Sequence, residues 1–315
     1  MILFTADYHL KLGAKNVPRD WARNRYYQFF EQVHTLEEQV DLHVIGGDIF
    51  DRVPTMEELE LFFDFIRGIK VQTYIYDGNH EATKKNSTFL TALKKVCKDI
   101  NKLVDIIDEP FCNNSFSILP YCDLHKPGSI EKLNKKLPLF THVRGEIPPH
   151  VIPEVDLSRF NDFPVVFAGD LHAHSNTQRN IVYPGSPMTT TFHRNKVDTG
   201  YILIDDDWSW KWCKFDLPQL LRKTVSDPAE MIKGEVDHII YELEGDLGDL
   251  SSIKNSELLD KKVVKRSSET ALMLDKSMSI GEELIEYLRY ILEISDEKIP
   301  EIVSLFNDYT KQMEA

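Results

Sequence analysis

Residues that can bind metal ions follow five short apolar segments of this 315-residue sequence. The segment 40–44 leads through Gly46 and Gly47 to Asp48, and glycines beside a carboxylate let a ligand approach the backbone closely. Four other apolar segments end in the same way, and the polar residues that follow them are Asp7 and His9, Asn79 and His80, His142, and Asp170 and His172. Oxygen and nitrogen donors without a thiolate suit divalent ions such as Mn²⁺, Mg²⁺ or Fe²⁺. The pattern therefore predicts a metal site with Asp48 at its centre.

The same residue types predict a hydrolytic reaction at phosphorus. Two divalent ions about 3.5–4 Å apart need a carboxylate that bridges them, and Asp48 is the natural bridge. Such a pair activates a water molecule and holds the attacking and leaving oxygens of an in-line displacement. The neutral amide of Asn79 adds a ligand without adding a charge that repels phosphate. His80 directly follows this ligand, so we expect it to point elsewhere, and either to donate a proton to the leaving oxygen or to stabilise the transferring phosphoryl group.

Strands and helices alternate in the first part of the sequence. The segments with the length and composition of buried strands that end at these polar residues are 2–6, 40–44, 71–76, 137–141 and 164–168. Helical spacing of apolar residues over 21–36, and a capping box at Thr55 and Glu58, predict helices between the first three strands. This βαβαβ order implies parallel strands, whose carboxyl ends meet at one edge of a sheet.

A second sheet is expected because strand candidates continue after the first three. These candidates are 104–107, 115–119, 181–183, 201–204 and 208–215, and a short helix is expected over 130–136. An α/β first part followed by a β-rich run predicts two packed sheets flanked by helices. The predicted fold class is therefore α/β, a four-layer α/β/β/α sandwich formed by residues 1–217.

The last third of the chain predicts two smaller parts. Weak strand patterns over 238–243, 262–265 and 270–274 predict a small α+β cap formed by residues 218–278. Ser279 and Glu282 form a capping box, and Pro300 stands where a second helix begins, so residues 279–315 are predicted to be a helical pair.

Charge is distributed unevenly along the chain. The net charge is −14, and residues 218–315 hold 12 Lys and Arg against 21 Asp and Glu, which gives −9 and leaves −5 for residues 1–217. This acidity argues against a free-standing protein that binds nucleic acid through a basic surface. One basic stretch follows the first strand, and its residues are Lys11, Lys15, Arg19, Arg23 and Arg25. Two interpretations stay open for it, a solvated helix face and a set of contacts to a phosphate backbone.

The four cysteines form no CxxC pair and show no zinc-site spacing, which is typical of reduced thiols. The N-terminus shows no signal-peptide pattern, and no apolar run reaches the roughly 20 residues that cross a bilayer. We therefore expect a soluble, cytoplasmic protein that does not associate with membranes.

The polar motifs together resemble the calcineurin-like metallophosphoesterases. The matching residues are Asp7 and His9, Gly47-Asp48, Gly78-Asn79-His80-Glu81, His142, and Gly169-Asp170-Leu171-His172. Within that superfamily, the stretches 7–10, 47–51 and 183–187, followed by Phe192, are similar to SbcD-type nuclease subunits, and the short chain with its acidic end is most similar to the bacteriophage members. This resemblance covers residues 1–215 well and the cap only in general layout.

The resemblance implies two divalent metal ions, with Mn²⁺ expected and Mg²⁺ as the alternative. It implies that Asp7, His9, Asp48 and His172 bind the first ion, and that Asp48, Asn79, His142 and Asp170 bind the second. It also implies that His80 is a catalytic residue that binds neither. The family usually has His where this chain has Asp170, so an alternative is that His174 completes the second site.

The resemblance further implies a DNA nuclease subunit with 3′–5′ exonuclease activity on duplex ends and endonuclease activity on single strands or hairpins, in DNA recombination, repair or replication. Its partner would be an SbcC-like ATPase bound by residues 279–315, within a heterotetramer that holds a homodimer of this chain, and the cap would bind DNA. A phage protein of this kind would act in the host cytoplasm. Two alternatives stay open, a small-substrate phosphodiesterase or protein phosphatase and a scaffold subunit with one metal site lost.

Overall fold

The computed structural model describes residues 1–84, 87–264, 278–292 and 294–313. The chain divides into two compact units. The first, called the body below, comprises Met1–Leu243 and Lys254–Lys262, and the second, called the C-terminal unit, comprises Glu244–Ile253 and Val263–Ala315. Across the described ranges, no helix is both long enough and apolar enough to cross a membrane.

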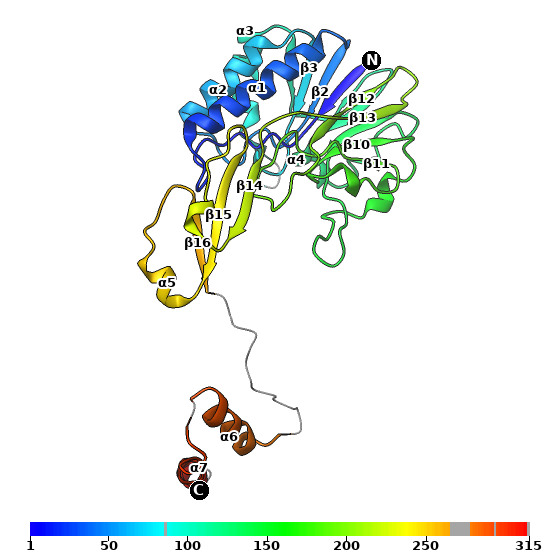
Figure 1. Ribbon diagram of the computed structural model, residues 1–315. Helices are drawn as coiled ribbons and strands as arrows, with labels where there is room; N and C mark the ends of the chain where they lie inside the picture. The colour runs from blue at the N-terminus through cyan, green and yellow to red at the C-terminus, as the bar shows by residue number, and fades with distance from the viewer. Residues whose placement is uncertain (85–86, 265–277, 293, 314–315) are drawn as a thin grey trace. The chain divides into compact units, whose positions relative to one another are not determined.

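A six-stranded sheet carries the first part of the body. Its order is β13-β12-β1-β2-β3-β6, and its strands are β1 (Ile2–Thr5), β2 (Leu42–Gly46), β3 (Gln72–Tyr76), β6 (Val104–Ile107), β12 (Gly200–Ile204) and β13 (Trp210–Lys214). β1, β2, β3 and β6 are parallel, whereas β12 runs antiparallel to both of its neighbours. Helices α1 (Arg19–Glu37), α2 (Met56–Gly68) and α3 (Leu90–Ile100) connect the parallel strands and cover one face of the sheet (Figure 1). The predicted βαβαβ order is confirmed.

Helix α2 shows how the sequence specifies one of these connections. The Thr55 hydroxyl accepts a hydrogen bond from the Glu58 backbone N–H, and the Glu58 carboxylate accepts one from the Thr55 N–H. This is the predicted capping box, which satisfies two N–H groups at the start of the helix. Leu61, Phe62 and Phe65 then lie on the buried side of α2.

A five-stranded sheet forms the second half of the sandwich. Its order is β11-β10-β9-β8-β7, and its strands are β7 (Phe111–Cys112), β8 (Ser117–Leu119), β9 (Leu139–His142), β10 (Val166–Gly169) and β11 (Ile181–Val182). The short helices α4 (Tyr121–Leu124) and η1 (Leu157–Phe160) bring apolar residues to its outer face. The helix predicted over 130–136 is wrong, because these residues form turns. The segment has only two apolar residues, Ile130 and Leu133, so a helix there would have little apolar surface to bury.

Aromatic side chains fill the space between the two sheets. The ring centroid of Phe140 on β9 lies 5.4 Å from that of Phe4 on β1 and 5.2 Å from that of Phe167 on β10, and all three side chains are fully buried. A fully buried side chain of this size stabilises the fold by about 1.5–3 kcal/mol. These aromatic contacts hold the two sheets together, and the four-layer α/β/β/α sandwich is confirmed.

Three further strands follow the sandwich in sequence. β14 (Leu220–Val225), β15 (His238–Gly245) and β16 (Leu259–Val264) form a sheet in that order, with β14 parallel to β15. β15 and β16 overlap predicted strands, and the strand predicted over 270–274 lies outside the described residues. The sequence does not indicate β14, because Arg222 and Lys223 interrupt its apolar pattern. The predicted domain boundaries after residues 217 and 278 stay predictions.

The remaining elements are short, apart from two helices in the C-terminal unit. The short ones are β4 (Ala82–Lys84), β5 (Ser87–Thr88), η2 (His174–Asn176), η3 (Pro228–Glu230) and α5 (Leu247–Ser252). The two helices are α6 (Ile280–Tyr290) and α7 (Ile299–Met313), which contact each other. Ser279 and Glu282 form both bonds of a capping box at the start of α6, and Pro300 is the second residue of α7. The predicted helical pair is confirmed.

Candidate metal centre

The polar residues at five strand ends meet at one edge of the sandwich. β1, β2 and β3 deliver Asp7 and His9, Asp48, and Asn79 and His80, while β9 and β10 deliver His142, and Asp170 and His172. The strands are parallel within each sheet, so their carboxyl ends lie on the same side. The donor atoms form three overlapping groups whose members lie within 4.8 Å of one another, namely Asp7, His9 and His172; His9, Asp48 and His80; and Asp7, Asp48 and His142.

The backbone at this edge is held in an unusual conformation. Asp7, His9, Asp48 and Asp170 have φ angles of 59°, 46°, 50° and 107°, which non-glycine residues rarely adopt. Such residues cost about 1–3 kcal/mol each and persist where their surroundings hold them. Here Asp7 N–H donates to the Gly47 carbonyl and His9 N–H to the Asp48 carbonyl, both at 3.0 Å. The two strand-end loops therefore fix each other.

Gly78 is required by the close packing of these loops. A Cβ atom at position 78 would lie 2.2 Å from the Asp48 Oδ1 atom and 2.5 Å from the Asp48 backbone nitrogen. Any side chain there would displace the Asp48 carboxylate, so the glycine lets β2 and β3 present their ligands side by side.

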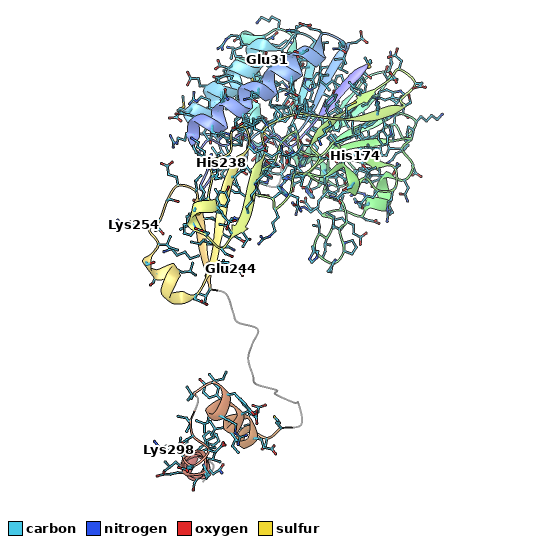
Figure 2. All side chains as sticks on the ribbon, in the orientation of Figure 1. Glu31, His174, His238, Glu244, Lys254 and Lys298 are labelled. Atoms are coloured by element: carbon cyan, nitrogen blue, oxygen red, sulfur yellow. The ribbon has the colours of Figure 1, made fainter. Side chains whose placement is uncertain are left out.

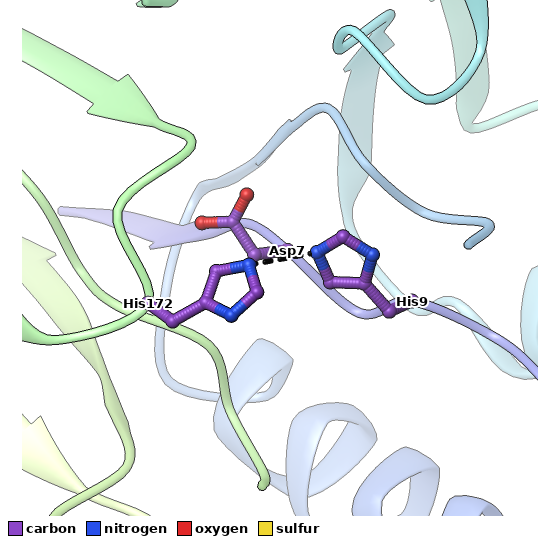
Figure 3. A group of neighbouring side chains, drawn as sticks. All are labelled: Asp7, His9 and His172. Carbon is purple, nitrogen blue, oxygen red and sulfur yellow. Dashed lines mark hydrogen bonds between the residues drawn. The ribbon is translucent and has the colours of Figure 1, made fainter. Parts of the chain in front are cut away.

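His9 and His172 face each other across the first group (Figure 3). Their Nε2 atoms lie 2.9 Å apart, and Asp7 lies beside them. Burial lowers the pKa of His9 to about 3 and also lowers the pKa of His172. Both rings are therefore neutral at pH 7 and have lone pairs for a cation. Their 2.9 Å contact is a hydrogen bond, in which one Nε2 atom donates and the other accepts.

Asp48 lies between the histidines of the two sheets. Its Oδ2 atom is 3.8 Å from His9 Nε2, 3.5 Å from His142 Nε2 and 3.9 Å from His80 Nε2. Its Oδ1 atom accepts a hydrogen bond from the His80 backbone N–H at 2.9 Å. Burial opposes ionisation of Asp48, but His142, His9 and His80 outweigh it and hold its pKa below the usual value. The carboxylate is therefore ionised and has donors of both sheets within reach.

His142, a member of the third group, lies close to Asn79 and Asp170. Its Nδ1 lies 2.8 Å from the Gly46 carbonyl oxygen, while its Nε2 lies 3.0 Å from Asn79 Oδ1 and 3.9 Å from Asp170 Oδ1. Burial opposes protonation of His142, but Asp48, Asp7 and Asp170 outweigh it and raise its pKa well above the usual value. The field at this position therefore favours a cation.

The two remaining histidines of the prediction differ in position. His80 Nδ1 lies 2.6 Å from the Asp51 carbonyl oxygen, which directs its Nε2 toward Asp48. His174, labelled in Figure 2, has Nδ1 2.6 Å from the Tyr183 carbonyl oxygen, and its ring stacks on Trp212 with centroids 5.3 Å apart. The structure thus brings Asp170 to the cluster and directs His174 to the backbone of Tyr183, just after β11.

The sequence matches known proteins along most of its length. The family described as "Calcineurin-like phosphoesterase" matches residues 1–198. The chain is 38% identical over 325 residues to the Escherichia phage T5 protein named "Probable exonuclease subunit 1", and the match covers 98% of both chains. This chain belongs to the calcineurin-like phosphoesterase family.

Two further likenesses are more distant. The Invertebrate iridescent virus 3 protein named "Putative phosphoesterase 078R" is 26% identical to this chain over 257 residues, which is 72% of this chain and 70% of the viral one. A solved structure titled "Structural and Functional Characterization of a Novel Archaeal Phosphodiesterase" covers 68% of this chain and 99% of its own, at 12% identity and a TM-score of 0.35.

The donor set of the phosphoesterase fits divalent ions. Its predicted ligands are carboxylates, imidazoles and one amide, a mixture that suits Mn²⁺ and related ions and contains no thiolate. Three carboxylates share the cluster, where burial raises the pKa of Asp7 well above its usual value, so a cation there would relieve an unfavourable field. The buried Nδ1 of His9 has no hydrogen-bond partner among the described residues. These features fit the divalent metals that the family uses.

Two residues of the centre have no role in the sequence prediction. Glu81 is fully buried and accepts hydrogen bonds from the backbone N–H groups of Asp48, Phe50 and Gly78 at 2.8–2.9 Å, so it fastens the loops after β2 and β3. In the sequence, Glu81 is marked only as the last residue of the Gly78–Glu81 motif. Arg144 contacts Asp170, and no motif indicates it.

The structure separates the members of the basic stretch. Arg25 is buried and donates to the Thr189 carbonyl oxygen at 3.0 Å, so a phosphate contact by Arg25 is wrong. Lys11 pairs with Asp51 at 2.6 Å beside the cluster, and Lys15 is exposed. The stretch is therefore neither a uniform solvated face nor a uniform phosphate surface.

Proposed function

We propose that this phosphoesterase is a metal-dependent DNA nuclease subunit that hydrolyses phosphodiester bonds with two divalent ions, Mn²⁺ or Mg²⁺. The observation that carries the proposal is the likeness, over 98% of both chains, to a phage protein named as an exonuclease subunit. The cluster at the five strand ends supports it, because Asp48 has donors from both sheets within 4 Å. By its resemblance to SbcD-type subunits, the enzyme would act as a 3′–5′ exonuclease on duplex ends and an endonuclease on single strands or hairpins.

The proposed ligands divide into two sets that share Asp48. Asp7, His9, Asp48 and His172 would hold one ion, and Asp48, Asn79, His142 and Asp170 would hold the other. When bound, the ions supply an activated water and offset charge on the phosphate. The neutral state of His9 and His172 keeps their ring nitrogens available as ligands.

His80 is the proposed proton donor. The Asp51 carbonyl accepts from Nδ1–H and thereby fixes the orientation of the ring. The Nε2 atom faces the cluster, and the side chain is about one-third exposed, so a substrate oxygen can reach it. A proton held at Nε2 could then pass to the leaving oxygen.

A groove beside the cluster supports a nucleic-acid substrate. It has a volume of about 510 Å³, and Lys11, Lys15, Arg222, Lys261 and Phe192 are among the residues that line it. Thr190 also lines it and places its Oγ1 3.2 Å from His172 Nδ1. Lys11, Arg222 and Lys261 pair with carboxylates in this structure, and Lys15 is exposed. Cations beside an aromatic side chain suit the phosphates and bases of a strand. Arg222 lies on β14 and Lys261 on β16, which supports a DNA-binding role for residues 218–278.

The proposal includes a protein partner. The phage T5 relative is named as a subunit, and the C-terminal unit exposes apolar side chains on both α6 and α7. By its resemblance, this chain would bind an SbcC-like ATPase through residues 279–315 and form a homodimer within a heterotetramer, in the cytoplasm of an infected host. Apolar anchors and a net charge of −6 over residues 279–315, from 9 acidic and 3 basic residues, suit a partner with a basic surface.

The test is degradation of end-labelled duplex DNA in Mn²⁺, with and without EDTA, beside hydrolysis of a small phosphodiester ester. The proposal predicts metal-dependent loss of the DNA label and weak turnover of the ester. Rapid turnover of the ester with intact DNA would favour the alternative, a small-substrate phosphodiesterase. Inactivity toward both substrates, with and without the ATPase partner, would contradict the enzymatic function.

A further inference from the structure

Arg144 and Asp170 form an ion pair at the rim of the candidate metal centre. Arg144 lies two residues after His142 at the end of β9, and Asp170 follows β10, the neighbouring strand. Two nitrogens of the guanidinium, Nε and Nη2, lie 3.3 Å from the two carboxylate oxygens of Asp170. The Asp170 side chain is 6% exposed and that of Arg144 is 36% exposed, so the pair joins the buried cluster to its surface.

The loop after β9 holds Arg144 in this position. Its Nη1 lies 3.5 Å from Glu154 Oε1, and the other oxygen of Glu154 accepts a hydrogen bond from the Tyr121 hydroxyl at 2.7 Å. His125 Nε2 also lies 3.1 Å from Glu154 Oε2. Tyr121 and His125 therefore hold one oxygen of Glu154, and its other oxygen fixes the Arg144 guanidinium over Asp170.

The charges around Asp170 explain why the pair is needed. The Asp7 carboxylate accepts a hydrogen bond from the Asp170 backbone N–H at 3.0 Å, so Asp7 and Asp170 are neighbours in the cluster that also holds Asp48. Charges buried together are costly unless they are offset. His142 lies between Asp48 and Asp170, at 3.5 and 3.9 Å from their oxygens. Arg144, whose guanidinium is always charged, also faces Asp170.

We propose that Arg144 is the charge partner of Asp170, and that it makes a third carboxylate tolerable in the metal centre. Arg144 is a positioning residue in this account: it holds the Asp170 carboxylate at the rim and offsets its charge when the second ion is absent. A bound ion takes over part of this role, so Arg144 and the ion act on the same carboxylate. The metal part of this inference rests on the proposed function.

The test is a double-mutant cycle of thermal unfolding in EDTA with Arg144→Gln, Asp170→His and the double variant. An imidazole at position 170 is a neutral donor that has no charge for Arg144 to offset. Arg144→Gln alone should lower Tm by about 2–4 °C, because Asp170 loses its counter-charge among two other carboxylates. In the Asp170→His background the same change should lower Tm by no more than about 1 °C, since only the part-exposed contact with Glu154 is lost.

Titration with Mn²⁺ supplies the second measurement. The Mn²⁺-induced rise in Tm should be larger in Arg144→Gln than in the wild type by about the 2–4 °C lost in EDTA, because the ion then offsets Asp170. Arg144→Lys should retain the wild-type response. Arg159→Gln is the matched control, because Arg159 makes a paired contact with Glu131 at 2.8 and 2.9 Å away from the cluster, and its loss should not change the response to Mn²⁺.

Equal losses of Tm in both backgrounds would overturn the proposal and assign Arg144 to the Glu154 loop instead. An unchanged Tm in Arg144→Gln, or a Mn²⁺ response equal to that of the wild type, would overturn it as well. A wild-type protein without any Mn²⁺ response would contradict the proposed two-metal function. The double-mutant cycle in EDTA would still show whether Arg144 and Asp170 are coupled, because that measurement needs no metal.

Discussion

The metal-binding edge of the body and the helical pair of the C-terminal unit differ in how their side chains are satisfied. At the edge, Asp7, Asp48 and His142 are buried, and each has hydrogen-bond or ionic contacts within the body. In the helical pair Leu288 and Ile299 are buried, but large apolar side chains such as Ile280 and Leu305 are 72% and 65% exposed. An exposed apolar stripe on a helix is typical of a surface that meets a partner. The proposed chemistry therefore belongs to the body, and the proposed assembly belongs to the helical pair.

Deletion of residues 279–315 should have the largest effect, because it removes the whole helical pair. Association with an SbcC-like ATPase should be lost, while metal-dependent cleavage of single-stranded DNA by the isolated chain should remain, because every proposed ligand lies before β13. Co-purification and a cleavage assay check the two halves. A truncated protein that still binds the ATPase at full stoichiometry would contradict the docking role, and an insoluble one would show that the helices serve folding instead.

Leu305→Glu and Ile152→Glu form the matched pair for this experiment. Both side chains are exposed apolar residues, one on α7 and the other on the body. Only Leu305→Glu should weaken association with the ATPase.

His80→Ala should reduce cleavage by about 10²–10⁴-fold, the usual contribution of a positioned acid or base. Binding of Mn²⁺ should stay close to that of the wild type, because His80 is proposed as a proton donor and not as a ligand. Calorimetric metal titration and a DNA cleavage assay measure the two quantities. His150→Ala, at an exposed histidine, is the control and should change neither. Loss of a metal ion in His80→Ala would show that the assigned role is wrong.

Lys15→Glu should raise KM for DNA by about tenfold, because it removes a cation near the phosphate backbone. It should leave kcat nearly unchanged. The effect should shrink as salt concentration rises. Hydrolysis of a small phosphodiester ester should not change, because such a substrate does not extend along the groove. Lys136→Glu, an exposed lysine outside the groove, serves as the control. Equal effects of Lys15→Glu and Lys136→Glu would show that the groove does not bind the DNA.

Glu58→Gln should give the smallest effect, and it concerns the stability of the body. Burial opposes ionisation of Glu58, but hydrogen bonds from Arg52, Thr55 and Leu12 outweigh it and lower its pKa to about 2. At pH 7 the variant should lose about 1–3 kcal/mol in the free energy of unfolding. Because the pKa of Glu58 is lower in the folded state, its contribution is present above the ordinary value of 4.5 and is lost as pH falls toward 2. Urea unfolding should therefore show the variant and the wild type converging over this range, and a constant difference would contradict the assignment.

The parts of the site that the sequence predicts are those with a local signal. Each strand end has an apolar run followed by a polar residue, and the parallel order places all these ends at one edge. The capping boxes at Thr55 and Ser279 are also local, since each needs only residues three positions apart. The positions of Asp48 and His172 therefore follow from pattern and topology together.

The parts that the sequence does not predict depend on contacts between distant residues. Arg144 contacts Asp170, 26 positions away, because β9 and β10 are neighbours, and no motif joins the two. β14 is a strand because it pairs with β15, although its charged residues hide the pattern. The segment 130–136 shows the reverse error, since Ile130 and Leu133 stand at helical spacing but the chain forms no helix there.

Bound Mn²⁺ and DNA cleavage, measured on the same preparations of the wild type and Asp48→Asn, test the proposed metal centre. We expect two ions per chain in the wild type and at most one in the variant, because Asp48 is the carboxylate proposed to serve both ions. Cleavage by the variant should fall by at least about 100-fold, as expected when a group that organises transition-state charge is lost. An Asp48→Asn protein that still holds two ions and cleaves DNA at the wild-type rate would contradict the proposed metal centre.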